Sequence, residues 1–277
     1  MTEIERPGFP WPLLKFWFWR TCPMWCAFAL VIFLMQMAIC GIIHDNERVK
    51  VMLKMIDMMP SILKTALGGE SLRVGNVSGL IAIGYNHPLV LLSYMFFAVS
   101  VPTGWLTGES QSGAMELILS RFVTKTQVYL CAALITLTGM FALVLVMFLG
   151  TVTATRLYDF GQPIPLYRFF QTAINAGLLA STIGAVALLA AATYRRRHMA
   201  VGVAVGFIVI NYFVSLIADW WPRMGWMKPI TLFTYVNGHK IFVEKVWPWT
   251  DMAVLVGVLL FAAMLGGIVW QRRDLSV

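Results

Sequence analysis

Six long stretches without a charged side chain dominate this sequence of 277 residues. Each runs for 18 residues or more without Asp, Glu, Lys or Arg. They cover residues 24–43, 89–106, 128–152, 169–193, 199–218 and 252–270. An α-helix rises about 1.5 Å per residue, so about 20 residues cross a hydrocarbon core about 30 Å thick. The pattern therefore predicts an all-α integral membrane protein with six transmembrane helices.

The overall composition agrees with this fold class. Only 12% of the residues are charged and 59% are hydrophobic, with a mean hydropathy of +0.76. A soluble domain carries about 25% charged residues. We therefore expect membrane lipids to cover much of the outside. The net charge of +8 suits contact with anionic lipid headgroups, and we expect no nucleic-acid partner.

The whole chain, residues 1–277, is predicted to be a single transmembrane domain that starts with an interfacial segment. Residues 1–22 contain several Trp and Phe residues together with Lys15 and Arg20. Amphipathic rings and basic side chains prefer the headgroup region of a membrane. We expect this segment to form an amphipathic helix that lies on the membrane and leads into the first span.

Two long connections are predicted to lie outside the cell. In the first, residues 44–88, apolar side chains at helical spacing predict an amphipathic helix over 49–67, and residues 75–85 are predicted to be a loop. The second, residues 219–251, is predicted to be an external or re-entrant connection.

The arginines indicate the orientation. An even number of spans places both ends of the chain on the same side of the membrane. Residues 195–197 are all Arg, and Arg272 and Arg273 follow the last span. Lys and Arg in short flanks resist translocation. We therefore expect a multi-pass protein of the cell (inner) membrane with both termini in the cytoplasm.

Small residues recur at helical spacing in two of the spans. Gly177, Ser181 and Ala185 lie four positions apart, and so do Gly202 and Gly206. Such spacing lets neighbouring helices approach closely. We expect both sets to be packing faces.

The four cysteines do not predict a disulfide framework or a metal site. Cys22, Cys26 and Cys40 lie in or beside the first span, and Cys131 lies in the third. At these positions cysteine behaves as a small apolar side chain. We expect no metal ion in this chain.

One connection between spans, residues 107–127, bears on function. It begins with Glu109 and continues through a hinge at Gly113 into one or two amphipathic helical turns that contain Glu116 and Leu117. A short helix of this kind suits docking into a groove of a partner protein. A helix lying on the membrane surface is equally compatible with the pattern.

The segment also resembles a known family. From Gly108 it reads Gly-Glu-x3-Gly-x2-Glu-Leu-apolar-Leu-Ser-Arg-x-Val-x-Lys, which is similar to the ABC-2 type permeases, the transmembrane subunits of ATP-binding cassette exporters. In that family the segment is the coupling helix that contacts the ATPase subunit. The family usually has Pro where this chain has Phe122. The six spans and the terminal Arg-Arg-Asp-Leu from position 272 resemble the family as well. The matching coupling residues are Glu109, Gly113, Glu116, Leu117 and Arg121.

The resemblance implies a permease that moves substrate across the membrane using ATP hydrolysed by a separate ATPase subunit. It implies a second permease copy, as a homodimer, and no enzyme activity or cofactor in this chain, since ATP and Mg are bound by the partner ATPase. The sequence agrees, because it contains no Gly-x4-Gly-Lys-Ser/Thr phosphate-binding loop. The six stretches also contain no ionisable side chain of the kind that couples transport to protons or sodium.

Two other interpretations stay open. The chain could be a membrane-embedded enzyme or an electron-transfer anchor that uses external groups such as His44, Asp45, His87 or His239. It could also be a structural scaffold for a membrane complex. The sequence indicates neither the transported substrate nor a substrate-binding residue, because ABC-2 permeases handle drugs, lipids, peptides and polysaccharides.

Overall fold

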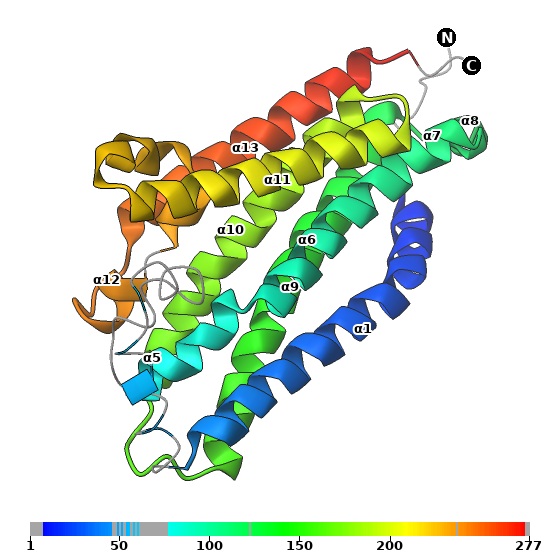
Figure 1. Cartoon of the computed structure of the whole chain (residues 1–277). Coiled ribbons are helices and arrows are strands. Elements are labelled where there is room, and N and C mark those ends of the chain that lie inside the picture. The colour runs from blue at the N-terminus through cyan, green and yellow to red at the C-terminus, as the bar shows by residue number, and fades with distance from the viewer. Residues whose placement is uncertain are drawn as a thin grey trace.

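The structure, a computed structural model, describes residues 8–45, 77–121, 123–236 and 238–274, with isolated residues between 49 and 60. Within these ranges the chain forms helices and the segments that join them, and no strand. Six of the helices are long and apolar enough to cross a membrane (Figure 1). The prediction of an all-α chain with six candidate spans is confirmed.

The first span, α1 (Trp11–Ile43), is one helix of 33 residues. The aromatic segment that we expected to form a separate helix is its first part, and the helix continues through Pro23. A proline inside a helix removes one backbone hydrogen bond and bends the helix. Figure 1 shows the first turns of α1 at an angle to the rest. That these turns lie in the headgroup region stays a prediction.

The chain forms two short helices before the second span. α5 (Val77–Ala82) leads into the 3-10 helix η1 (Ile83–Asn86), and every residue of α5 is buried. The prediction of a loop over residues 75–85 is therefore wrong from Val77 onward. The predicted amphipathic helix over residues 49–67 lies largely outside the described residues.

The second span leads directly into the predicted coupling segment. α6 (Pro88–Pro102) continues as a π-helix, η2 (Thr103–Gly108), and then as α7 (Glu109–Gln111). After a turn come α8 (Ala114–Leu119) and the third span, α9 (Lys125–Leu157). The hydroxyl of Thr124 and the side chain of Gln127 cap the start of α9 reciprocally. Such a capping box fixes where α9 begins.

Three further spans complete the bundle: α10 (Leu166–Thr193), α11 (Arg197–Trp220) and α13 (Trp249–Arg272). Between the last two lie the 3-10 helices η3 (Pro222–Ile230) and η4 (Leu232–Tyr235), followed by α12 (Gly238–Phe242). This connection folds back on the spans, because Asn211 of α11 accepts a hydrogen bond from the backbone N–H of Leu232 at 2.9 Å. An ion pair of 2.9 Å between Lys240 and Asp251 ties α12 to α13.

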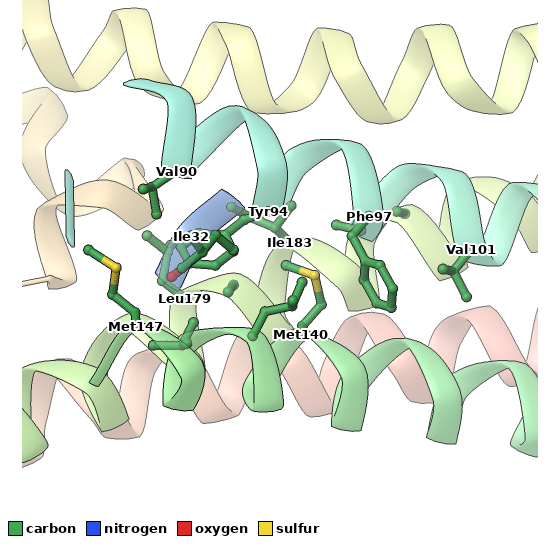
Figure 2. Packing of buried hydrophobic residues seen from close by; sticks show 14 of the residues in the cluster. Ile32, Val90, Tyr94, Phe97, Val101, Met140, Met147, Leu179 and Ile183 are labelled. Atoms are coloured by element: carbon green, nitrogen blue, oxygen red, sulfur yellow. The ribbon is translucent and has the colours of Figure 1, made fainter. Parts of the chain in front are cut away.

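The centre of the bundle is α10. In its most apolar 18-residue window 72% of the residues are buried, against 17% in that of α11. Figure 2 shows Leu179 and Ile183 of α10 gathered with Met140 of α9 and with Tyr94 and Phe97 of α6. α11 and much of α1 thus present apolar faces that the described chain does not cover.

Small residues let α9 and α10 approach closely. A Cβ atom added at Gly177 would lie 2.9 Å from the ring of Phe141, and one at Gly184 would lie 3.2 Å from Thr136. The predicted packing face of this span is confirmed. In contrast, a Cβ atom at Gly202 or Gly206 would meet nothing within 4 Å. Within the described part of the chain these two glycines have no neighbouring helix beside them, so their packing face stays a prediction.

Both ends of the described chain lie beside the start of α9. Gln127 donates a hydrogen bond from Nε2 to the carbonyl of Gly8 at 3.0 Å, and Lys125 donates from Nζ to the carbonyl of Arg273 at 2.7 Å. Figure 1 shows the start of α1, the end of α13, and α7 and α8 at one end of the bundle, with α5 and α12 at the opposite end. This arrangement agrees with an even number of spans.

Candidate functional site

The candidate site is the turn between α7 and α8, at the end of the bundle that also holds the start of α1. Gly113 has φ of 77°, in the left-handed region that glycine adopts at little cost. The chain can therefore end α7 at Gln111 and begin α8 at Ala114 in a new direction. The hinge and the helical turns after it lie where the sequence predicted them.

The two faces of α8 have opposite surroundings. Met115 is only 1% exposed and belongs to the hydrophobic core, whereas Leu117 is 70% exposed. Glu116 and Arg121 are also exposed, and Ile118 is partly buried. Met115 thus packs one face of α8 against the bundle. On the other face apolar Leu117 is exposed together with the charged side chains of Glu116 and Arg121.

Glu109 precedes the hinge and faces α1. Its side chain is 16% exposed and accepts a hydrogen bond from Nη1 of Arg20 at 3.2 Å. The guanidinium of Arg20 lies 5.2 Å from the centre of the Trp105 ring, and that ring stacks on Trp17 at 4.9 Å. Trp105 also donates from Nε1 to the hydroxyl of Thr21 at 3.1 Å. The start of the predicted coupling segment is therefore tied to the first span.

A groove of about 810 Å³ runs between the first turns of α1 and α8. Leu13 and Phe16 of α1 and Leu117 and Ile118 of α8 provide its apolar lining. Its charged and amide side chains are those of Arg20, Glu109, Arg121 and Gln127. A concave apolar surface with a charged rim can take up a helix or loop of a partner protein.

The segment is also connected to α10 and α11. The side-chain oxygen of Gln111 accepts a hydrogen bond from the backbone N–H of Arg197, the first residue of α11, at 3.2 Å. Thr107 donates its hydroxyl to the carbonyl of Ala191 near the end of α10 at 3.1 Å. A displacement of α7 would therefore act on the turn between these two spans.

A second group of contacts closes the same end of the bundle. Trp270 donates from Nε1 to the carbonyl of Lys125 at 2.9 Å. Arg273 donates from Nη1 to the carbonyls of Ala191 and Ala192 at 3.1 and 3.3 Å. Burial and the positive charge of Arg195 lower the pKa of Arg273. We call Lys125, Trp270 and Arg273 the terminal clasp. Together they join the start of α9 to the ends of α10 and α13.

Of the predicted site residues, Glu109, Leu117 and Arg121 line the groove, whereas Gly113 and Glu116 are not among its lining residues. The sequence did not indicate Arg20 as the partner of Glu109, nor the ring of Trp105 over which Arg20 lies. The only signal for Arg20 was its place in the aromatic segment before the first span, and Trp105, which lies in η2, had none. The bond between Trp105 and Thr21 joins residues 84 positions apart, so no local pattern indicates it.

The groups proposed for other chemistry lie elsewhere. Nδ1 of His44 lies 2.6 Å from the carbonyl of Gly41 at the end of α1, and His87 caps the start of α6. The sulfurs of Cys22 and Cys26 lie 3.8 Å apart, and all four cysteines are free. Among the described residues, no three His, Cys, Asp or Glu side chains form a group that could hold a metal ion. No family model matches the sequence, and no curated protein matches it either.

Proposed function

We propose that this chain is the permease subunit of an ABC transporter, which exports substrate with ATP hydrolysed by a separate ATPase subunit. The observation that carries the proposal is the construction of α8. Buried Met115 anchors the helix to the bundle, while Leu117, which lines the groove, and its sequence neighbour Glu116 stay exposed. A short helix held on one face and open on the other suits docking to a partner protein.

The contacts of α7 suggest how a movement of the ATPase would reach the spans. Glu109 is bonded to Arg20 in α1, and Gln111 is bonded to the first residue of α11. Between α7 and the second span lies the π-helix η2, a type of segment that is frequent at functional sites. In this proposal a displacement of α8 acts on α1 and α11 together.

The same two helices are the ones we propose to face a second copy. Only 28% of the most apolar window of α1 and 17% of that of α11 are buried. On α11, Gly202 and Gly206 have open space beside them. Small residues allow close contact between helices in a membrane, and a two-fold pair of copies would enclose a pathway at its interface. We therefore propose a homodimer that binds two ATPase subunits.

The proposed orientation places the end with α7 and α8, and both termini, in the cytoplasm of a cell with this protein in its (inner) membrane. Arg195, Arg196, Arg197 and Arg272 support it, since basic residues in short flanks resist translocation. A cysteine introduced at exposed Trp226 of η3 should react with an impermeant thiol reagent in intact cells, while one at position 196 should not. The opposite labelling pattern would reverse the orientation.

The coupling role is tested by reversing the charge of Glu116. A charged contact in an interface costs about 2–5 kcal/mol when one side is lost. Glu116→Arg should therefore lower recovery of the complex with the ATPase, and its ATP hydrolysis, by about tenfold or more. Glu244→Arg is the control, because Glu244 is exposed between α12 and α13 at the opposite end. If Glu116→Arg retains normal recovery and ATP hydrolysis, α8 is not the coupling helix.

A further inference from the structure

A second pocket, of about 440 Å³, lies on the other side of the ion pair between Arg20 and Glu109. Its walls come from α1, from the end of α6 with η2, and from the first residue of α11. It differs from the groove beside α8 because its lining includes two arginines, Arg20 and Arg197, and the hydroxyl groups of Ser100 and Ser112. We call it the arginine pocket.

Arg197 has the features of an anion-binding residue. Within the described part of the chain its guanidinium has no acidic partner, and only its backbone N–H is bonded, to Gln111. The side chain lies along two glycines of the π-helix: a Cβ atom at Gly104 would lie 3.8 Å from Nη2, and one at Gly108 would lie 3.7 Å from Cδ. The glycines leave room beside the guanidinium that larger side chains would fill.

The charged groups around the pocket carry a net positive charge. Arg20 and Arg197 face one carboxylate, Glu109, which leaves one net positive charge on the lining. Arg195 and Arg196 precede Arg197 in the same turn. The pocket also lies at the N-terminal end of α11, a helix of 24 residues whose dipole favours negative charge there. The charge of the lining, the neighbouring arginines and the helix dipole all attract an anion, and their effects add.

The pocket lies at the depth where lipid headgroups are expected. The charge-free parts of the first, second and fifth spans begin or end at Met24, Leu106 and Met199, each within four residues of Arg20, Glu109 or Arg197. Beyond these positions α1 and α11 have exposed apolar side chains, such as Leu30 and Val203. A headgroup bound in the pocket would have its tails beside these side chains, so that in the proposed homodimer the lipid would lie at the boundary between the two copies.

We propose that the arginine pocket binds the phosphate of an anionic phospholipid from the surrounding leaflet. Basic pockets between transmembrane helices bind lipid phosphates in this way. The guanidinium groups of Arg197 and Arg20 donate charge-assisted hydrogen bonds to the phosphate oxygens. The apolar side chains of α1 and α11 hold the acyl chains. This inference does not depend on the transport function, because it uses only the pocket and its position relative to the bilayer.

The test measures lipid retention by native mass spectrometry of the full chain purified in neutral detergent. Phosphatidylglycerol is the anionic probe and phosphatidylcholine the neutral one. The unsubstituted protein should retain one phosphatidylglycerol at least about tenfold more tightly than phosphatidylcholine, because the positively charged lining repels the choline cation, which phosphatidylglycerol lacks. Arg197→Gln should abolish this preference. Gly104→Leu, which fills the pocket and keeps both arginines, should abolish it as well.

Arg196→Gln is the matched control, because Arg196 is exposed in the same turn and does not line the pocket. It should retain the preference for phosphatidylglycerol. An equal loss in Arg196→Gln and Arg197→Gln would overturn the proposal in favour of general surface charge. Equal retention of the two lipids by the unsubstituted protein would also overturn it. Displacement of phosphatidylglycerol by millimolar inorganic phosphate would show that the pocket takes a soluble anion, which contradicts a lipid site.

Discussion

Arg20 in α1 and Glu109 in α7 form an ion pair that joins residues 89 positions apart, with 3.2 Å between Nη1 and Oε1. The two side chains differ in exposure, because Glu109 is 16% exposed and Arg20 is 60% exposed. Arg20 also lies over the ring of Trp105. The pair separates the groove beside α8 from the arginine pocket, and both cavities include its two residues in their lining.

The first prediction concerns the strength of this pair. Because Arg20 is largely exposed, solvent screening limits the coupling energy between Arg20→Gln and Glu109→Gln to about 0.5–1 kcal/mol. A double-mutant cycle on thermal unfolding in detergent measures it. Glu116→Gln serves as the control, since Glu116 is exposed on α8, and it should show no coupling to Arg20→Gln. Additive effects of Arg20→Gln and Glu109→Gln would show that the pair does not stabilise the fold.

The second prediction separates the two faces of α8. Met115→Ala should lower the free energy of unfolding by about 2–4 kcal/mol, because Met115 is 1% exposed and its loss leaves a cavity. Leu117→Ala should change it by less than about 0.5 kcal/mol, because Leu117 is 70% exposed. Unfolding midpoints measure both. If Leu117→Ala destabilises the chain as much as Met115→Ala, a contact outside the described residues buries Leu117.

The sequence predicted the spans because the membrane sets a length that charge-free stretches reveal directly. It did not predict where the helices end. The helix expected within residues 1–22 continues without a break through Pro23 as α1, because a charged residue at a membrane surface ends a hydrophobic stretch without ending the helix. α5 was missed because its six residues are too few for a helical period to appear among turn-forming neighbours.

The candidate site was predictable only where its geometry is local. A glycine hinge followed by side chains at helical spacing predicted the helical turns of α8, but it did not indicate that Met115 is the buried residue. The partner of Glu109 depends on how α1 packs against η2, and no spacing within residues 107–127 contains that information. For the same reason the sequence treated Arg197 as an orientation signal and did not indicate the pocket that it lines.

The third prediction concerns a buried amide between two glycines. Gln36 of α1 donates from Nε2 to the hydroxyl of Thr151 at 2.9 Å. A Cβ atom at Gly84 would overlap its side-chain oxygen, and one at Gly150 would lie 3.1 Å from its Cβ. Gly84→Ala should therefore cost about 1–3 kcal/mol of stability through overpacking.

The same overlap disappears when the amide is removed. In a Gln36→Ala background, Gly84→Ala should cost much less, and the two substitutions should show strong coupling in thermal unfolding. Gly257→Ala in α13 is the control, since a Cβ there meets nothing within 4 Å. An equal cost of Gly84→Ala in both backgrounds would mean that the loss comes from the backbone of η1 or from Met147, whose Cε would lie 3.0 Å from the added Cβ, and not from Gln36.

The last prediction concerns the terminal clasp. The final carbonyls of a helix have no partner within the helix, and Arg273 donates to two of them, at Ala191 and Ala192 of α10. Arg273→Gln should leave these partly buried carbonyls without a charged donor and lower the free energy of unfolding by about 1.5–3 kcal/mol.

Arg272→Gln is a matched control with the same charge change one residue earlier. Because Arg272 is exposed, its replacement should cost less than about 0.5 kcal/mol. Arg273→Lys should rescue only part of the loss, since an ammonium group lacks the planar fork of a guanidinium. Equal shifts of the unfolding midpoint in Arg272→Gln and Arg273→Gln would show that the clasp does not hold the end of α10.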